Sequence, residues 1–186
     1  MRSLSSREFA VLIPILRSVH ENHDHRDRVI LCVRPERQSD SFSGQVCLPG
    51  GAREPEDASL SACALRETEE EIGVPRSSVE IVDEIRWHTT SLGHRVKPFA
   101  AHLDANVELR PNPDEVRDLV FLPVERITAS LFHVRGHRTN PAGERHEVLT
   151  FDLDGQEVWG LTARILHTYF LTDSPTPEHP ERSPKP

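Results

Sequence analysis

The stretch LRETEEEIGV, residues 65–74, places glutamates at four of five successive positions shortly before a glycine. Carboxylates three or four residues apart on a helix repel one another, and the helix dipole disfavours acidic groups at a C-terminal end. At about 100° per residue, Glu67, Glu70 and Glu71 share one face of a helix. Carboxylate oxygens that converge in this way suit hard divalent cations such as Mg²⁺. The stretch therefore predicts a helix with a metal-binding face.

The residues around the glutamates support this interpretation. A helix over residues 57–72 has a second, mostly apolar face that can pack in a core. Upstream, Gly50 and Gly51 join a strand to this helix, and a backbone without Cβ can approach a phosphate or a cation closely. A solvated acidic face is the alternative for an isolated run of glutamates. The paired glycines favour the metal site.

Composition limits the class of protein. The length of 186 residues suits one domain, and 22 basic against 30 acidic residues argue against nucleic acid as a partner. The apolar run FAVLIPIL near the N-terminus is too short to span a membrane, so no membrane association is expected. Three cysteines, Cys32, Cys47 and Cys63, lie in apolar stretches and are expected to be reduced core residues. The cytoplasm is the expected compartment, and formation of a homodimer is left open.

Most of the chain has the periodicity of strands. The expected strands cover residues 8–18, 28–35, 44–51, 79–91, 94–104 and 146–153. Residues 119–127 are expected to form a strand that leads into a short helix, and residues 154–160 a turn with a short strand. The longer expected helices cover 57–72 and 161–171. This pattern predicts an α/β (α+β) fold with helices on the faces of a mixed sheet. The Pro-rich tail, residues 174–186, is expected to be disordered. His20, His23 and His25 are interpreted as part of a solvated loop, with a metal site as the alternative.

The glutamate segment resembles the Nudix box, G-x5-E-x7-R-E-U-x-E-E-x-G-U, in which U is an aliphatic residue. Gly51 matches the first glycine, and residues 66–74 match the second half except at Thr68. Two departures lie in the first half: Asp57 replaces the early glutamate, and the gap to Arg66 is one residue too long. The resemblance implies an α/β/α sandwich with a mixed central sheet, formed here by residues 1–173.

Segments outside the box resemble the coenzyme A pyrophosphatases among Nudix proteins. The segment LCVRPERQSDSFSGQVCLPGG, residues 31–51, is similar to an L-x-x-R-S start leading to G-x3-F-P-G-G, with Pro35 in place of Ser and Leu48 in place of Phe. The C-terminal stretch EVWGLTARILHTYF, residues 157–170, resembles the W-G-x-T-A-R helix of the same group. The similarity covers roughly residues 8–172.

The resemblance implies roles for individual residues. It makes Glu67 and Glu71 the principal ligands of Mg²⁺ or Mn²⁺, Glu70 a third ligand, and the Gly51 carbonyl a backbone ligand. Arg66 would hold a carboxylate in place, with an ordinary surface arginine as the alternative. The remaining candidates lie outside the helix. Glu115 is the candidate general base or a further metal ligand, unless it is a solvated loop acid, and the candidates for substrate binding are Arg34, Gly50, Gly51, His94 and Lys97.

The implied reaction is hydrolysis of the pyrophosphate of coenzyme A or its derivatives, giving adenosine 3',5'-bisphosphate and 4'-phosphopantetheine. The nearest alternative is a Nudix pyrophosphatase for ADP-ribose, dinucleotides or nucleoside triphosphates, because loops choose the substrate. A non-catalytic nucleotide sensor has the intact acidic cluster against it. A partner-binding module has only the Pro-rich tail in its favour.

Overall fold

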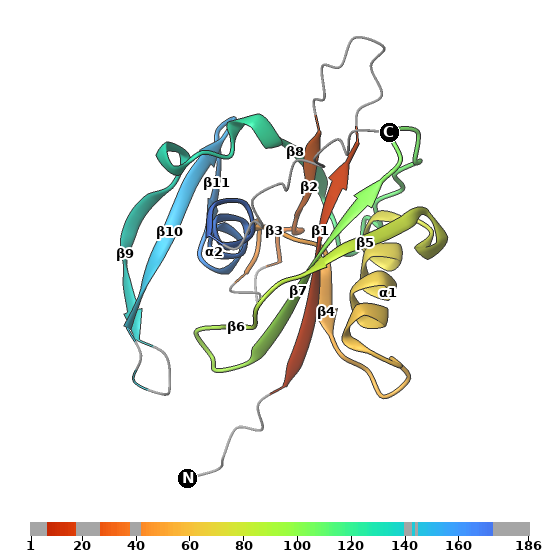
Figure 1. Ribbon diagram of the computed structural model, residues 1–186, viewed down its shortest axis with the longest axis horizontal. Helices are drawn as coiled ribbons and strands as arrows, with labels where there is room; N and C mark the ends of the chain where they lie inside the picture. Colours follow the sequence, from red (N-terminus) through yellow and green to blue (C-terminus); the bar gives the residue numbers. More distant parts are fainter. Residues whose placement is uncertain (1–6, 18–26, 38–41, 140–142, 144, 173–186) are drawn as a thin grey trace, which may run out of the picture.

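The computed structural model describes residues 7–17, 27–37, 42–139, 143 and 145–172 (Figure 1). The tail at 174–186 and the loop with His20, His23 and His25 lie outside these residues. The described strands of the central sheet are β1 (Glu8–Leu16), β2 (Arg28–Val33), β3 (Val46–Cys47), β4 (Gly50–Ala52), β5 (Val79–Glu84), β6 (His88–Thr89), β7 (Arg95–Leu103) and β8 (Asp118–Pro123). The other described elements are α1 (Leu60–Ile72), α2 (Leu161–His167), β9 (His133–Thr139), β10 (Arg145–Leu153), β11 (Gln156–Trp159), and the short helical turns η1 (Arg76–Ser78), η2 (Val124–Arg126), η3 (Ala129–Leu131) and η4 (Thr168–Thr172).

The central sheet is mixed, as expected. Its path is β3-β2-β1-β7-β5, with β4 beside β1, β6 beside β7 and β8 beside β2. β1 and β7 run parallel along their whole length, and the other pairs are antiparallel. Along one side, β1 pairs with β2 through its C-terminal end and with β4 through its N-terminal end. Gly50 and Gly51, which belong to β4, therefore pair with the N-terminal part of β1, beyond the end of its pairing with β2.

Helices cover both faces of this sheet (Figure 1). On one face α1 packs against β1 and β7 through small residues, including Ala10, Ala64 and Ala101, so that its backbone comes close to the sheet. On the other face α2 packs through Ile165 and Leu166 against a larger apolar cluster. The three-stranded sheet β11-β10-β9 covers the outer side of α2. The α/β (α+β) sandwich with a mixed sheet is confirmed.

The observed elements differ from the sequence expectation in several places. The first helix was expected from residue 57, but Ser59 is its N-cap and accepts a hydrogen bond from the Ala62 N–H at 3.0 Å. Asp57 therefore belongs to the preceding loop. The strand expected over 79–91 is divided into β5 and β6, with residues 85–87 outside both, and β5 itself contains a register shift between Ile81 and Asp83. β9 was not predicted, since its sequence HVRGHRT has no alternation of apolar and polar residues.

The three cysteines behave as core residues. All three are free thiols, with Cys32 and Cys63 buried and Cys47 half-buried. None of the helices in the described ranges is long and apolar enough to cross a membrane.

Candidate functional site

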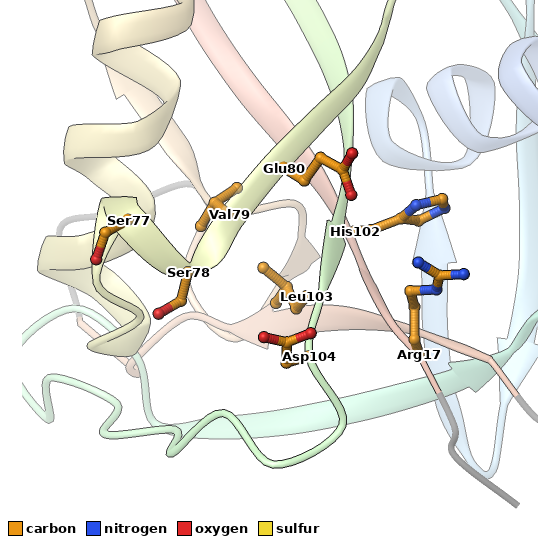
Figure 2. A pocket seen from close by; sticks show the side chains of 8 residues that line it. All are labelled: Arg17, Ser77, Ser78, Val79, Glu80, His102, Leu103 and Asp104. Carbon is orange, nitrogen blue, oxygen red and sulfur yellow. The ribbon is translucent and has the colours of Figure 1, made fainter.

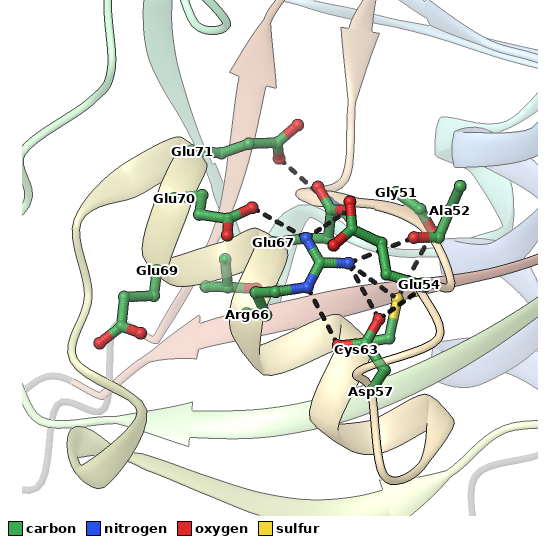
Figure 3. Close-up of polar contacts among 12 residues, drawn as sticks. Gly51, Ala52, Glu54, Asp57, Cys63, Arg66, Glu67, Glu69, Glu70 and Glu71 are labelled. Atoms are coloured by element: carbon green, nitrogen blue, oxygen red, sulfur yellow. Dashed lines mark hydrogen bonds and ion pairs between the residues drawn. The ribbon is translucent and has the colours of Figure 1, made fainter.

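Arg66 organises the acidic residues of α1 (Figure 3). Its Nε and Nη2 donate to the two carboxylate oxygens of Asp57, each at 3.0 Å. Its Nη1 lies 3.0 Å from Glu67 Oε1 and 2.9 Å from Glu70 Oε2. Nη2 also donates to the Ala52 carbonyl at 3.2 Å. A single guanidinium thus connects α1, β4 and the loop before the helix.

Asp57 explains the departures from the Nudix box. The side chain is buried, and the hydrogen bonds from Arg66 hold the pKa of its carboxyl far below the ordinary value. The Glu54 N–H donates to the same carboxylate at 2.9 Å. Asp57 lies in the loop before the N-cap Ser59, and Arg66 and the glutamates lie within the helix.

Glu67 and Glu71 face the paired glycines. The Gly50 N–H donates to Glu71 Oε2 at 3.0 Å, and burial raises the pKa of the Glu71 carboxyl to about 8. Burial also raises the pKa of Glu67. A Cβ on Gly51 would lie 2.4 Å from the Glu67 carboxyl carbon, and Gly50 has φ +146° with a Cβ position 2.3 Å from the Ala10 carbonyl. Larger residues at these positions would displace the glutamates or the strand.

Glu115 reaches the same place from a distant part of the sequence. The Arg110 N–H donates to the Ile72 carbonyl at 2.8 Å, and the Asn112 N–H donates to the Glu71 carbonyl at 2.9 Å. These bonds satisfy carbonyls that the end of α1 leaves free. The charge of Glu115 contributes to the raised pKa values of Glu67 and Glu71, so the three carboxylates lie close together.

A cavity of about 250 Å³ opens between these groups. Basic side chains of the segment after β2 line it together with the glutamates, and Arg37 Nη2 donates to the Asp114 carbonyl. The residues that line the cavity are Arg34, Pro35, Arg37, Gly50, Gly51, Ala52, Glu67, Glu71, Asp114 and Glu115. It therefore combines carboxylates, glycine backbone and guanidinium groups.

Most of the candidate residues from the sequence meet here. Arg34, Gly50, Gly51, Glu67, Glu71 and Glu115 line the cavity. Arg66 lies beside it, and the more exposed Glu70 is held by Arg66. Two candidates lie elsewhere: His94 packs on Phe9 with ring centroids 5.5 Å apart, and Lys97 pairs with Glu84 at 3.5 Å.

Sequence reasoning missed two contributors to the site. Arg37 follows Arg34 by three residues, but a single arginine in a polar loop carried no signal of its own. Asp57 was noted only as a departure from the box, although an acidic residue at a motif position beside a motif arginine could have suggested the ion pair.

The residues suit a divalent cation. Within the described ranges, no group of three histidine, cysteine or acidic side chains is already arranged at metal-binding distances. The donor set nevertheless fits, because Glu67, Glu71 and Glu115 repel one another and Gly51 leaves room that a Cβ would fill. A hard cation such as Mg²⁺ or Mn²⁺ would offset this repulsion.

A second cavity, of about 180 Å³, lies at the other end of the sheet (Figure 2). Arg17 and His102 line it together with Glu80 and Asp104, so neither sign of charge dominates. None of the box glutamates reaches it. The first cavity is therefore the candidate active site.

Similar proteins are known over most of the length of the chain. Residues 10–140 match the NUDIX domain family. A Photorhabdus laumondii protein named uncharacterized Nudix hydrolase NudL is 32% identical over 164 residues, which cover 88% of this chain and 83% of that protein. A Yersinia pestis protein of the same name is 34% identical over 166 residues, covering 88% and 78%.

A structural comparison supports the fold. The crystal structure of a C. elegans Ap4A hydrolase binary complex superposes with a TM-score of 0.50 at 18% identity, covering 63% of this chain and 80% of that one. The acidic helix, the paired glycines and the extent of the family match lead to one conclusion. The chain belongs to the Nudix family of hydrolases, which act on nucleoside diphosphate derivatives and generally use divalent metal ions.

Proposed function

We propose that this protein hydrolyses the pyrophosphate of coenzyme A or its derivatives with Mg²⁺ or Mn²⁺. The observation that carries the proposal is the position of Arg34, which lines the same cavity as Glu67 and Glu71. Arg34 belongs to the segment that resembles coenzyme A pyrophosphatases, so the segment specific to that group contributes directly to the site. Its guanidinium suits a phosphate because it offers paired donors to two oxygens.

The arrangement of charges suits a phosphoanhydride. Phosphate oxygens repel an incoming nucleophile, so a hydrolase must neutralise their charge before water can attack. Arg34 and Arg37 provide positive charge on one side of the cavity, where they would bind and orient the substrate phosphates. The carboxylates on the other side would repel the same phosphates unless a cation lay between them.

Glu67, Glu70 and Glu71, with the Gly51 carbonyl, would hold that cation. When bound, it supplies neutralising charge and lowers the pKa of a coordinated water. Arg66 holds the carboxylates of Glu67 and Glu70, and the Gly50 N–H fixes Glu71.

Glu115 is the proposed general base. It lines the cavity from a separate loop. The carbonyl of its neighbour Asp114 accepts a hydrogen bond from Arg37 Nη2. In this position its carboxylate would accept the proton of the attacking water. The new P–O bond forms as the bridging P–O bond breaks, and coenzyme A plus water gives adenosine 3',5'-bisphosphate and 4'-phosphopantetheine.

The test is hydrolysis of coenzyme A with Mg²⁺ or Mn²⁺, with the products resolved by chromatography and ADP-ribose as the parallel substrate. Glu71→Gln is expected to lose activity. Glu69→Gln is the matched control, because Glu69 lies on the same helix but pairs with Arg76 at 2.7 Å, away from the cavity.

Each outcome separates the alternatives. Cleavage of coenzyme A into the two expected products, lost only in Glu71→Gln, supports the proposal. Cleavage of ADP-ribose, dinucleotides or nucleoside triphosphates in place of coenzyme A would keep the metal chemistry and reject the substrate. Binding of nucleotides without turnover of any of them would identify a sensor.

A further inference from the structure

A row of paired residues leads from the active-site cavity across the sheet. Ala52, which lines the cavity, is the register partner of Phe9. Phe9 is the partner of Val96, and Val96 is the partner of His88. Residues directly opposite each other point to the same face of a sheet. At about 4.8 Å per strand, the row extends about 14 Å from the cavity along the face that α2 covers.

The first part of the row is aromatic. The rings of Phe9 and His94 lie 5.5 Å apart with an interplanar angle of 34°, and the Arg7 guanidinium lies 5.8 Å from the Phe9 ring. The His94 N–H donates to Thr90 Oγ1 at 3.1 Å, which holds the histidine against the β6–β7 turn. Both rings are only half-buried. Flat, partly exposed rings beside a phosphate-binding cavity suit a nucleobase, which stacks on aromatic side chains.

The far part of the row is basic. Arg164, the arginine of the W-G-L-T-A-R stretch, is half-buried, and its Nη2 donates to the Thr89 carbonyl. Its Nε is buried and has no hydrogen-bond acceptor within the described ranges, and no described carboxylate forms an ion pair with it.

His88 lies next to Arg164 and also has a side-chain nitrogen without a hydrogen-bond partner among the described residues. Its side chain is only 7% exposed, and its Nε2 is buried without a partner among the described residues. The charges of Arg164 and Arg86 act on this ring. Keeping a guanidinium in such surroundings without an opposite charge is costly, so the arrangement favours an anion beside it.

The groups found here are therefore a phosphate cavity, the aromatic pair Phe9 and His94, and the half-buried cation of Arg164 beside His88. We propose that Phe9 and His94 stack the base of the bound nucleotide and that Arg164 binds a second phosphate carried by its ribose. This inference rests on the proposed function, because it assumes a nucleotide whose pyrophosphate occupies the cavity. It assigns to Arg164 the discrimination between coenzyme A, whose adenosine carries a 3'-phosphate, and ADP-ribose, whose adenosine does not.

The experiment measures binding and does not depend on turnover. Titration calorimetry compares adenosine 3',5'-bisphosphate with adenosine 5'-monophosphate on the wild type, Arg164→Gln, Arg164→Lys and Arg126→Gln. Arg126 is the control, because it pairs with Asp154 at the surface at 3.1 Å. A charged hydrogen bond predicts that the wild type binds the bisphosphate about 10- to 100-fold more tightly.

Arg164→Gln is expected to bring this ratio close to one and to leave binding of the monophosphate unchanged. Arg164→Lys is expected to give an intermediate ratio, because it keeps the charge without the paired donors. Phe9→Leu is expected to weaken both ligands equally. Thermal unfolding confirms that each variant is folded. If Arg164→Gln does not fold, the comparison of Arg164→Lys with the wild type tests the inference.

Equal binding of the two ligands by the wild type would overturn the inference, as would an equal loss of both in Arg164→Gln. These results are separate from the hydrolysis test. A ratio that depends on Arg164 in a protein that does not cleave coenzyme A supports the inference and rejects the proposed function. Cleavage of coenzyme A by a protein that binds the bisphosphate and the monophosphate equally supports the proposed function and rejects the inference.

Discussion

Acidification is expected to destabilise the protein through His88. The ring is buried on the α2 face, and its burial, followed by the charges of Arg164 on α2 and Arg86 before β6, lowers the pKa of His88 to about 4. In the unfolded chain the pKa returns to about 6.5. Because the folded pKa is the lower one, the unfolded state binds the proton first, and stability falls as the pH decreases below about 6.5.

The size of the effect follows from the difference between the two pKa values. Linkage with a folded pKa of about 4 gives a loss of about 2 kcal/mol between pH 7 and pH 5, and roughly 3 kcal/mol once the pH is below both values. For a domain of this size, about 2 kcal/mol corresponds to a decrease in Tm of roughly 4–8 °C.

The assay is thermal unfolding of the wild type and of His88→Gln and His88→Leu at pH 7 and pH 5. Carboxylates also contribute to the pH dependence, so the quantity to compare is the decrease in Tm between the two pH values. The decrease in Tm should be smaller in both variants than in the wild type, by most of the roughly 4–8 °C expected from His88. An equal decrease in wild type and variants would refute the assignment of this pH dependence to His88.

Three other substitutions test the site. Gly51→Ala should reduce kcat by at least about 100-fold with little loss of fold, since the new Cβ would meet the Glu67 carboxylate; steady-state kinetics with Mg²⁺ measures this. Asp57→Asn should lower the free energy of unfolding by about 3 kcal/mol in urea titrations, because it leaves the Arg66 guanidinium without its buried partner. Gly73→Ala should cost about 1 kcal/mol for its φ of 71° and also reduce kcat, because its Cβ would lie 2.6 Å from the Arg110 carbonyl. A Gly73 variant with unchanged kcat would show that this loop does not position Glu115.

The sequence was sufficient where local rules decide the structure. The helical spacing of Glu67 and Glu71 follows from chain geometry alone, and the apolar runs of β1 and β7 are long enough to identify buried strands. The predicted start of α1 at residue 57 was wrong, because Asp57, a plausible helix residue, is bound by Arg66 in a tertiary contact. The positions of His94 and Lys97 outside the lining of the cavity could not be predicted, because strand register cannot be read from periodicity, and their part in substrate binding stays a prediction.

The position of the acidic residues depends on contacts at both ends of α1. Before the helix, Arg66 binds the loop of Asp57 and the Ala52 carbonyl, which joins the first turns to β4. After the helix, the Arg110 and Asn112 N–H groups bind carbonyls of its last turn, and this attachment brings the segment with Glu115 to the cavity. The repulsion among the carboxylates would otherwise separate these segments. Two sets of hydrogen bonds outside the cavity therefore hold the carboxylates close together.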